Sequence, residues 1–416
     1  MRAMVPVLLC GLAGCVSIEA DPHRYRFENG LWYADGAFER RTAYISEGRL
    51  HFGSTDEAAA QTIDLGGGYV VPPYCEGHNH NLGGHADLEA VDATVREYLT
   101  DGVFYAMMPG SFARYRAQIA DRLDRPDSVD VVFANNGITG PGGHPRLLRE
   151  QLMERFGLYS EFTPETLPDK GYFEAADSAE LREKWRLVLA DKPDFVKVML
   201  LFSEEFEQRK DDPGSYGRRG LDPALLPELV ALAHGEGLRV AVHVETEADM
   251  VVAIEADADI IAHLPSYDAN RRLSDETVEL ARASGIALVT TFSLAKRMEQ
   301  RDPEEYAATL ASQKDNLARL EKAGAWLVVG SDNTRDTSRA EANHLAALGA
   351  LDNAALLRMW TVDCARLLFP ERKIGRLAEG YEASFLVLEG DPLADFASTA
   401  KIALRVKDGK VLELSE

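Results

Sequence analysis

Apolar residues in the middle of the chain occur in short, compact runs separated by segments with a helical period. The runs contain many β-branched residues and few polar ones, which is typical of strands buried on both faces of a parallel sheet. The intervening segments, such as 225–237, place apolar residues at i, i+3 and i+4 and end in glycine, as amphipathic helices do. The runs occupy residues 102–109, 129–137, 194–201, 238–245, 258–265, 285–292 and 326–333.

A further run, 69–80, brings the number of predicted strands to eight. Eight strands that alternate with helices predict a TIM-type (β/α)8 barrel, in which active-site side chains lie at the carboxyl ends of the strands. Two connections, 138–178 and 201–222, are unusually long. Because long loops in compact domains are often functional, we expect both to lie over the mouth of the barrel.

The two ends of the chain show a different pattern, with short alternating strands separated by turn residues. This pattern occupies residues 24–71 and returns at 374–416. We therefore expect an α/β protein in which a small β-sandwich domain, built from both termini, accompanies a barrel of residues 72–373.

The first fifteen residues, MRAMVPVLLCGLAGC, begin with one basic residue followed by an apolar run too short to span a bilayer. The run ends at Leu12–Cys15, which resembles the lipobox of a bacterial lipoprotein signal. The resemblance implies that residues 1–14 are a signal peptide and that Cys15 carries a lipid anchor. A plain secretory signal cleaved nearby is the alternative. The lipobox interpretation predicts an extracytoplasmic protein anchored on the periplasmic side of a membrane.

Composition narrows the set of partners. The formal net charge is −23, which argues against binding to nucleic acid or to an anionic membrane surface, because both need clustered Lys and Arg. Hydrophobic residues make up 46% of the chain, enough for a sizeable core. The four cysteines show no disulfide framework. A small-molecule substrate is the expected partner, and the oligomeric state cannot be read from the sequence.

Candidate metal ligands interrupt several of the predicted strands. His78 and His80 are two residues apart, so on a strand both imidazoles face the same side. Such a pair is weak evidence alone, since most are structural. Three other strands add His243, His263 and Asp332 near their carboxyl ends.

A lysine on a further strand strengthens the prediction of a shared metal site. Lys197 lies inside the apolar run DFVKVML, where an unpaired ammonium group is costly to bury. Nitrogen and oxygen donors from five strands therefore converge on one mouth, which satisfied core residues do not explain.

This set of residues resembles the amidohydrolase superfamily, in which the first strand carries HxH, the fourth Lys, the fifth and sixth His, and the eighth Asp. The flanking segments DLGGGYVVPP (64–73) and IGRLAEGYEASFLVLEGDPL (374–393) resemble the junctions with the small β domain in that superfamily. The resemblance covers nearly the whole mature chain.

The resemblance implies two divalent ions. His78, His80 and Asp332 would bind one ion and His243 and His263 the other, with a carboxylated Lys197 bridging both. This ligand mixture suits Zn²⁺, with Mn²⁺, Co²⁺ and Fe²⁺ as alternatives. Two such ions activate water and polarise a scissile carbonyl, and Asp332 would act as general base and then general acid.

Several further residues are candidates for substrate contact or for lining the mouth. The loop GPGGHP (140–145) resembles one in the branch of Xaa-Pro dipeptidases and related carboxypeptidases, which implies that His144 contacts substrate; an exposed flexible-loop histidine is the alternative. The chain as a whole is placed nearest to Xaa-Pro dipeptidase or imidazolonepropionase-like enzymes. Tyr216 and Arg218, with the adjacent Arg219, lie in the second long loop. A guanidinium there can hold a carboxylate bidentately, or it can simply be solvated. His85, close to the HxH motif, is a further candidate for lining the mouth.

The expected function is hydrolysis of a carbon–nitrogen bond in a small amide, peptide or cyclic imide. A lactone or ester hydrolase using the same site is an alternative. A non-catalytic substrate-binding lipoprotein is another, although retention of every ligand position argues against it.

Overall fold

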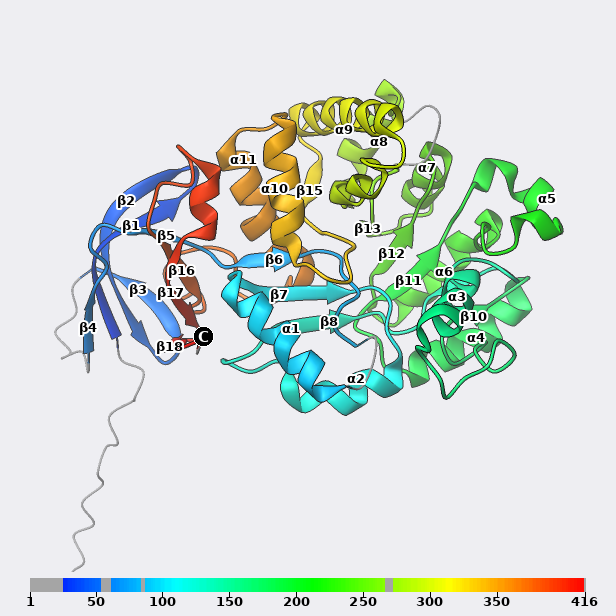
Figure 1. Ribbon diagram of the computed structural model, residues 1–416, viewed down its shortest axis with the longest axis horizontal. Coiled ribbons are helices and arrows are strands. Elements are labelled where there is room, and N and C mark those ends of the chain that lie inside the picture. Colours follow the sequence, from blue (N-terminus) through cyan, green and yellow to red (C-terminus); the bar gives the residue numbers. More distant parts are fainter. Residues whose placement is uncertain (1–24, 54–60, 84–86, 266–271, 415–416) are drawn as a thin grey trace, which may run out of the picture.

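The computed structural model describes residues 25–53, 61–83, 87–265 and 272–414. The predicted signal peptide, Cys15 and His85 lie outside these residues. Among the described residues, no helix is both long and apolar enough to cross a membrane. Figure 1 shows a β-rich end, blue and red, beside a larger body in which strands and helices alternate.

Strands from both ends of the chain share one mixed sheet. Its hydrogen-bonded order is β18-β17-β16-β5-β1-β2-β3, and β4 also pairs with β1. The strands are β1 (Tyr25–Ala34), β2 (Ala37–Ser46), β3 (Arg49–Phe52), β4 (Gln61–Asp64), β5 (Tyr69–Val71), β16 (Phe385–Leu388), β17 (Ile402–Lys407) and β18 (Lys410–Val411). We expected a sandwich of two sheets, but the ladder is continuous because β5 pairs with β1 on one side and with β16 on the other.

Aromatic side chains form the core of this sheet. The fully buried Trp32 ring lies 5.2 Å from the ring of Phe52 and 5.1 Å from that of Phe385, in edge-to-face contacts. Because these rings come from β1, β3 and β16, the sheet must curl to bring its distant strands together. Backbone hydrogen bonds from β3 to residues 380–381 support the same curvature.

The larger body contains short parallel strands in two ladders, β6-β7-β8 and β10-β9-β11-β12-β13-β14-β15. They are β6 (Tyr74–Glu76), β7 (Val103–Met108), β8 (Asp130–Phe133), β9 (Ile138–Thr139), β10 (Phe173–Glu174), β11 (Val196–Met199), β12 (Val240–His243), β13 (Ile260–Ile261), β14 (Ala287–Val289) and β15 (Trp326–Val328). The predicted runs contain these strands but extend beyond them, for example 258–265 against Ile260–Ile261, and β9 and β10 lie in the predicted connection 138–178. The predicted strand 69–80 is divided. Pro72 and Pro73, which lack a backbone N–H, divide it into β5 of the small sheet and β6 of the body.

Further hydrogen bonds connect the two ladders at both edges. At one edge, β8 pairs with β7 and the following strand, β9, pairs with β11. In addition, the Asp194 N–H, just before β11, donates a hydrogen bond to the Phe133 carbonyl at the end of β8. At the other edge the Gly77 N–H donates to the Val329 carbonyl, and a parallel bridge joins Asn79 to Asn333. The resulting cyclic order agrees with the predicted eight-stranded barrel.

Helices surround these strands (Figure 1). They are α1 (Leu88–Thr100), α2 (Ala113–Ile119), α3 (Arg146–Phe156), α4 (Ser178–Ala190), α5 (Phe206–Arg209), α6 (Leu226–Gly235), α7 (Glu247–Glu255), α8 (Asp275–Ser284), α9 (Pro303–Ala323), α10 (Ser338–Leu348), α11 (Asn353–Arg358) and α12 (Cys364–Leu368). Side-chain caps fix several starts; Thr246, for example, forms a capping box with Asp249 at α7.

The two long connections are structured and lie against each other. The first contains α3, and the second contains α5. The Gly217 N–H donates to the Gly142 carbonyl, and the His144 N–H donates to the Arg219 carbonyl. Both connections follow the carboxyl ends of neighbouring strands, so their contact forms a shared wall over that end of the body.

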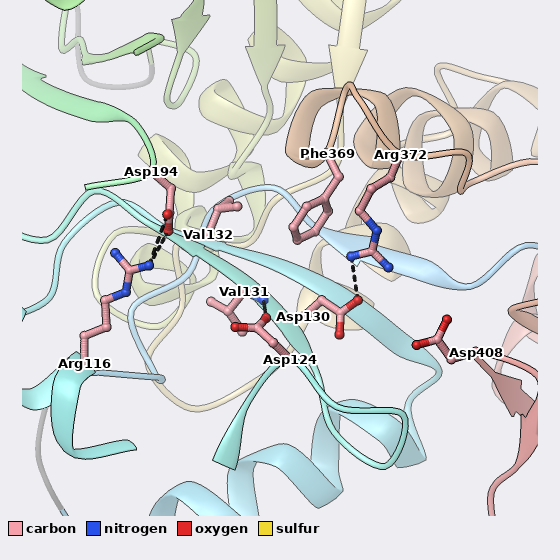
Figure 2. Close-up of a pocket in the computed structure, with 9 residues that line it drawn as sticks. All are labelled: Arg116, Asp124, Asp130, Val131, Val132, Asp194, Phe369, Arg372 and Asp408. Atoms are coloured by element: carbon pink, nitrogen blue, oxygen red, sulfur yellow. Dashed lines mark hydrogen bonds and ion pairs between the residues drawn. The ribbon is translucent and has the colours of Figure 1, made fainter. Parts of the chain in front are cut away.

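A cavity of about 420 Å3 lies at the opposite, amino-terminal end of β8 (Figure 2). Its lining is mostly charged, and none of the predicted metal ligands contributes to it. Beside the cavity, Asp130 of β8 accepts a hydrogen bond from Arg372 at 2.7 Å and one from Lys407 of β17 at 2.6 Å. This ion-pair network connects the small sheet to the larger body.

Candidate metal centre

The HxH motif lies directly after β6, where the chain passes very close to the segment that follows β15. A Cβ atom on Gly77 would lie 2.8 Å from the Val329 carbonyl oxygen, and one on Gly330 would lie 2.7 Å from the His78 nitrogen. Only glycine permits this approach of two backbones. The approach brings the two histidines next to Asp332.

Glu76 holds the same two segments together. Its buried carboxylate accepts hydrogen bonds from the His78 N–H, the Ser331 N–H and hydroxyl, and the Asn79 amide. Burial raises the pKa of Glu76 to about 7, while these donors act in the opposite direction. Glu76 thus positions the ligand-bearing backbone without reaching the centre itself.

The Nε2 atoms of the His78 and His80 rings face each other. Nδ1 of His78 lies 2.5 Å from the Ala262 carbonyl, and Nδ1 of His80 lies 3.2 Å from the Gly110 carbonyl. Because a carbonyl oxygen only accepts, Nδ1 carries the proton in both rings and Nε2 presents a lone pair. The two Nε2 atoms are 3.2 Å apart.

Asp332 completes this first group. Its Oδ1 lies 3.4 Å from His78 Nε2 and 3.2 Å from His80 Nε2. Burial opposes ionisation of the carboxyl group, but the two histidines outweigh it and hold its pKa below the ordinary range. The Asp332 backbone has φ = 48°, a left-handed conformation that Asp tolerates better than most residues.

A second pair of imidazoles lies beside the first group. Nδ1 of His243 is 2.6 Å from Nε2 of His263, and the His263 ring centroid is 5.7 Å from that of His78. The other nitrogen of His243 lies 3.2 Å from Glu245 Oε1, to which its N–H donates. Burial lowers the pKa of His263 to about 3, so its ring is neutral and free to act as a ligand.

Lys197, on β11, carries a buried amine that has no hydrogen-bond partner among the described residues. Its side chain is 2% exposed, and its Nζ forms no hydrogen bond with any described residue. Burial lowers the pKa of Lys197 to about 7, although Asp332 acts in the opposite direction. An unpaired buried ammonium group is unfavourable, so burial favours the neutral amine, a partner or a modification.

These features fit divalent metal. The donor atoms of His78, His80 and Asp332 lie within 4.8 Å of one another, close enough to hold one ion. The facing imidazole nitrogens, and the hydrogen bonds that the other ring nitrogens of His78, His80 and His243 form with carbonyl or carboxylate oxygens, are typical of metal ligands. The orphaned Lys197 amine lies in the same buried region and influences the pKa values of His78 and His263.

Comparison with known proteins identifies the family of this chain. Residues 168–412, more than half of the chain, match the model of the amidohydrolase family. The chain belongs to the amidohydrolase family.

Individual members show the extent of the likeness. Ochratoxinase of Aspergillus niger is 26% identical over 301 residues, a match that covers 68% of this chain but only 60% of that protein. Its crystal structure superposes with a TM-score of 0.73 at 20% identity, covering 93% of this chain and 95% of that one. A Xaa-Pro dipeptidase with bound methionine gives a TM-score of 0.71 at 18% identity, covering 94% and 100%. Family membership confirms the predicted hydrolase class, and the structural likeness shows a shared fold.

The candidate substrate residues of this amidohydrolase lie in different surroundings. The His144 ring stacks on His243 with 4.9 Å between centroids, so it lies at the centre. The Tyr216 hydroxyl donates to Glu150 at 2.7 Å. Arg218 is exposed, and its side chain forms no hydrogen bond with a described residue. Arg219 donates to the Pro141 carbonyl and so holds the first long connection in place.

The sequence did not single out two residues that the structure brings near the centre. Glu245 follows His243 by two positions, and this i, i+2 relation on an extended chain was a usable signal. Arg149 lies on α3 with nothing in its local pattern to distinguish it from surface arginines. Only its burial among residues distant in sequence makes it notable.

Proposed function

We propose that this protein is a metal-dependent hydrolase that cleaves a carbon–nitrogen bond in a small amide, peptide or cyclic imide. The observation that carries the proposal is the convergence of two facing imidazole pairs with a buried carboxylate and an orphaned lysine. The names of relatives support the bond type, since a Xaa-Pro dipeptidase cleaves a peptide bond.

The proposed ligand set has two halves. His78, His80 and Asp332 would hold one ion, and His243 and His263 a second. The nitrogen and oxygen donors suit Zn²⁺, with Mn²⁺, Co²⁺ or Fe²⁺ as alternatives. Bound divalent ions would lower the pKa of water and polarise the scissile carbonyl.

Lys197 is proposed to bridge the two halves as a carbamate. With a pKa of about 7, a substantial fraction of the amine is neutral near neutral pH. The neutral nitrogen attacks carbon dioxide, a nitrogen–carbon bond forms, and one proton leaves. The product carries one negative charge shared by two oxygens in place of an unpaired cation, which removes the unfavourable burial of the ammonium group.

Asp332 is proposed to move the proton. Its carboxylate lies against both histidines of the HxH motif and is kept ionised, so it can accept a proton from the attacking water. It then donates that proton to the leaving nitrogen. Glu245 orients His243 through the hydrogen bond to its ring.

The proposal is tested by elemental analysis of the purified protein followed by a substrate screen. We expect bound divalent metal and hydrolysis of at least one N-acyl amino acid, dipeptide or cyclic imide. Turnover confined to lactones or esters would replace the proposed bond type. Metal and ligand binding without any turnover would instead support a non-catalytic binding protein.

Replacing Lys197 with Ala should abolish both metal retention and activity, because the bridging oxygens are lost. Short carboxylic acids added to Lys197→Ala should restore part of both, since a small carboxylate can occupy the vacated space. Metal content and turnover are measured with and without added formate or acetate. Lys322→Ala, which removes an exposed lysine on α9, is the control and should behave as wild type. Full metal content and activity in Lys197→Ala would exclude the bridge.

The proposed location is the periplasmic side of a bacterial membrane, through lipid on Cys15. Cys15→Ser should prevent lipid attachment and move the protein from the membrane fraction to the soluble fraction, because the anchoring thiol is gone. Fractionation and metabolic labelling with a fatty acid measure this. Labelled Cys15→Ser protein would show that the lipobox assignment is wrong. Cys10→Ser is the matched control and should stay in the membrane fraction.

A further inference from the structure

Two buried cysteines lie together behind the HxH motif. Cys75 is in β6, three residues before His78, and Cys364 is the first residue of α12. Both side chains are 0% exposed, and both carry free thiols in this structure. They are far apart in the sequence, which is why spacing alone indicates no disulfide between them. The fold brings them into one place.

Two backbone carbonyls tie the cysteines to each other. The Cys75 thiol donates to the Thr361 carbonyl at 3.6 Å, and the same carbonyl accepts the Cys364 N–H. On the other side, the Cys364 thiol donates to the Val329 carbonyl at 3.8 Å, which also accepts the Gly77 N–H at 2.9 Å. Each thiol therefore lies beside the backbone segment that carries the other one, and the two side chains contact each other.

Aromatic packing fixes the two segments that carry the pair. The Tyr74 ring stacks on the Trp360 ring with 3.8 Å between centroids, and both rings are fully buried. Tyr74 precedes Cys75, and Trp360 lies in the π-helical turn η6 (Met359–Asp363) that leads directly into Cys364. Because protein cores are densely packed, neither segment can move away from the other without opening the core. The folded chain thus holds the two thiols side by side.

Burial makes the pair unreactive after folding. Removal from water raises the pKa of the Cys364 thiol, and the neighbouring Cys75 thiol raises it further. The thiolate, which is the reactive form, is therefore scarce, and oxidants and reductants do not reach fully buried sulfur atoms. The oxidation state of the pair must be set while the chain folds, when both thiols are still in contact with water.

We propose that Cys75 and Cys364 form a structural disulfide when the chain folds in the presence of a disulfide oxidant, such as oxidised glutathione. The thiolate of one cysteine attacks the oxidant, and half of the oxidant leaves as a thiol. The second cysteine thiolate then attacks the mixed disulfide, the protein S–S bond forms, and the other half of the oxidant leaves. Two cysteine thiols are oxidised, the oxidant is reduced to two thiols, and the two cysteine protons pass to its leaving sulfur atoms.

The bond joins β6 to α12 and closes a loop that contains most of the larger body. A cross-link that closes a long loop removes many conformations from the unfolded chain, so it stabilises the folded one. It also fastens the strand that leads into His78 and His80. This inference concerns the scaffold behind the candidate centre, so it does not depend on which bond the enzyme hydrolyses.

The test counts reactive thiols in folded wild-type protein. The full chain is produced in bacterial cells with an oxidising cytoplasm, so that the outcome does not depend on where the chain is directed. The purified protein is denatured in guanidinium with iodoacetamide, with or without prior reduction, and digested with trypsin. Before reduction we expect peptides 50–96 and 359–366 as one cross-linked species, with fewer than about one chain in ten labelled at either cysteine. After reduction both cysteines should be labelled.

Labelling of both cysteines before reduction in folded wild-type protein would overturn the proposal. Linkage of either one to glutathione, to Cys10 or to Cys15 would do the same. Cys75→Ala is the control, because it leaves Cys364 without a partner and should make Cys364 fully reactive in denaturant before reduction. The wild-type count decides the question even if this variant does not fold.

Unfolding in urea tests the structural role of the bond. The reduced reference is the same chain from cells grown with dithiothreitol, which has the same residues in its core but no S–S bond. The oxidised chain should unfold at a higher urea concentration, and this difference should vanish when reductant is added to the denaturant. Equal midpoints for the oxidised and reduced chains would overturn the stabilising role. If no amide is hydrolysed while the bond and its effect on unfolding are present, the proposed function fails and this inference stands.

Discussion

Asp332→Asn should retain most of its bound metal and yet lose kcat by about 10²–10⁴-fold, the range attributed to general acid–base catalysis. Asn keeps the shape of the side chain and one oxygen that can act as a ligand. It has no carboxylate to accept the proton from water. The two proposed functions of Asp332, ligand and base, are thereby separated in one variant.

Leaving groups of graded basicity make this experiment sharper. A basic leaving amine must be protonated as the bond breaks, so Asp332→Asn should impair it most. An activated anilide needs less protonation and should be impaired less. Metal content and kcat are measured on one preparation for each substrate. Near wild-type turnover in a metal-replete Asp332→Asn protein would remove Asp332 from the mechanism.

Asn333→Ala is a matched control for changes in this loop. Asn333 follows Asp332 directly, and its side-chain amide donates to Asp336 rather than to a candidate ligand. Its substitution should therefore alter kcat much less than Asp332→Asn does. A comparable loss in both variants would indicate that loop geometry, not proton transfer, explains the effect.

Asp130→Ala should lower the free energy of unfolding by about 3–5 kcal/mol, the typical cost of breaking a buried ion pair from one side. Lys407 is 1% exposed, and its Nζ donates to Asp130 at 2.6 Å and to the Arg125 carbonyl at 2.7 Å. Without Asp130 the ammonium group stays buried with a single neutral acceptor. The small sheet, which contributes Lys407, should then detach more readily from the body.

Denaturation in urea measures this effect, and a second substitution tests its cause. Lys407→Met in the Asp130→Ala background removes the unpaired charge, so the double variant should recover part of the lost stability. Glu279→Ala, which breaks an exposed ion pair with Arg282 on α8, should leave the midpoint almost unchanged. If the double variant is no more stable than Asp130→Ala, the loss comes from packing rather than from an orphaned charge.

Much of the candidate centre could be predicted from spacing alone. In parallel sheets the carboxyl ends of all strands meet at one edge, so a polar residue near each strand end indicates a shared site without any knowledge of distances. His78, His243 and Asp332 follow this rule. The structure adds the reason that two of these segments meet so closely, since Gly77 and Gly330 allow their backbones to touch.

The fold of the two termini was predictable only in part. Alternation and turns indicate strands at both ends, because the period of two is a local property. The pairing of strands, in contrast, depends on residues that are far apart in the sequence. Whether 25–71 and 385–411 form two sheets or one depends on β5, which lies between β1 and β16, and the break between β5 and β6 depends on two prolines within one apolar run.

The sequence by itself determined which candidate metal ligands this protein carries and in what order they follow along the chain. Only the tertiary structure decided their states: that the Nε2 atoms of His78 and His80 carry the free lone pairs, that the Lys197 amine has no partner, and that Arg149 is a buried cation rather than a surface charge. The physical reason is that residue type and period are properties of a short segment. Burial and hydrogen bonding depend on groups that are far away in the chain and near only after folding.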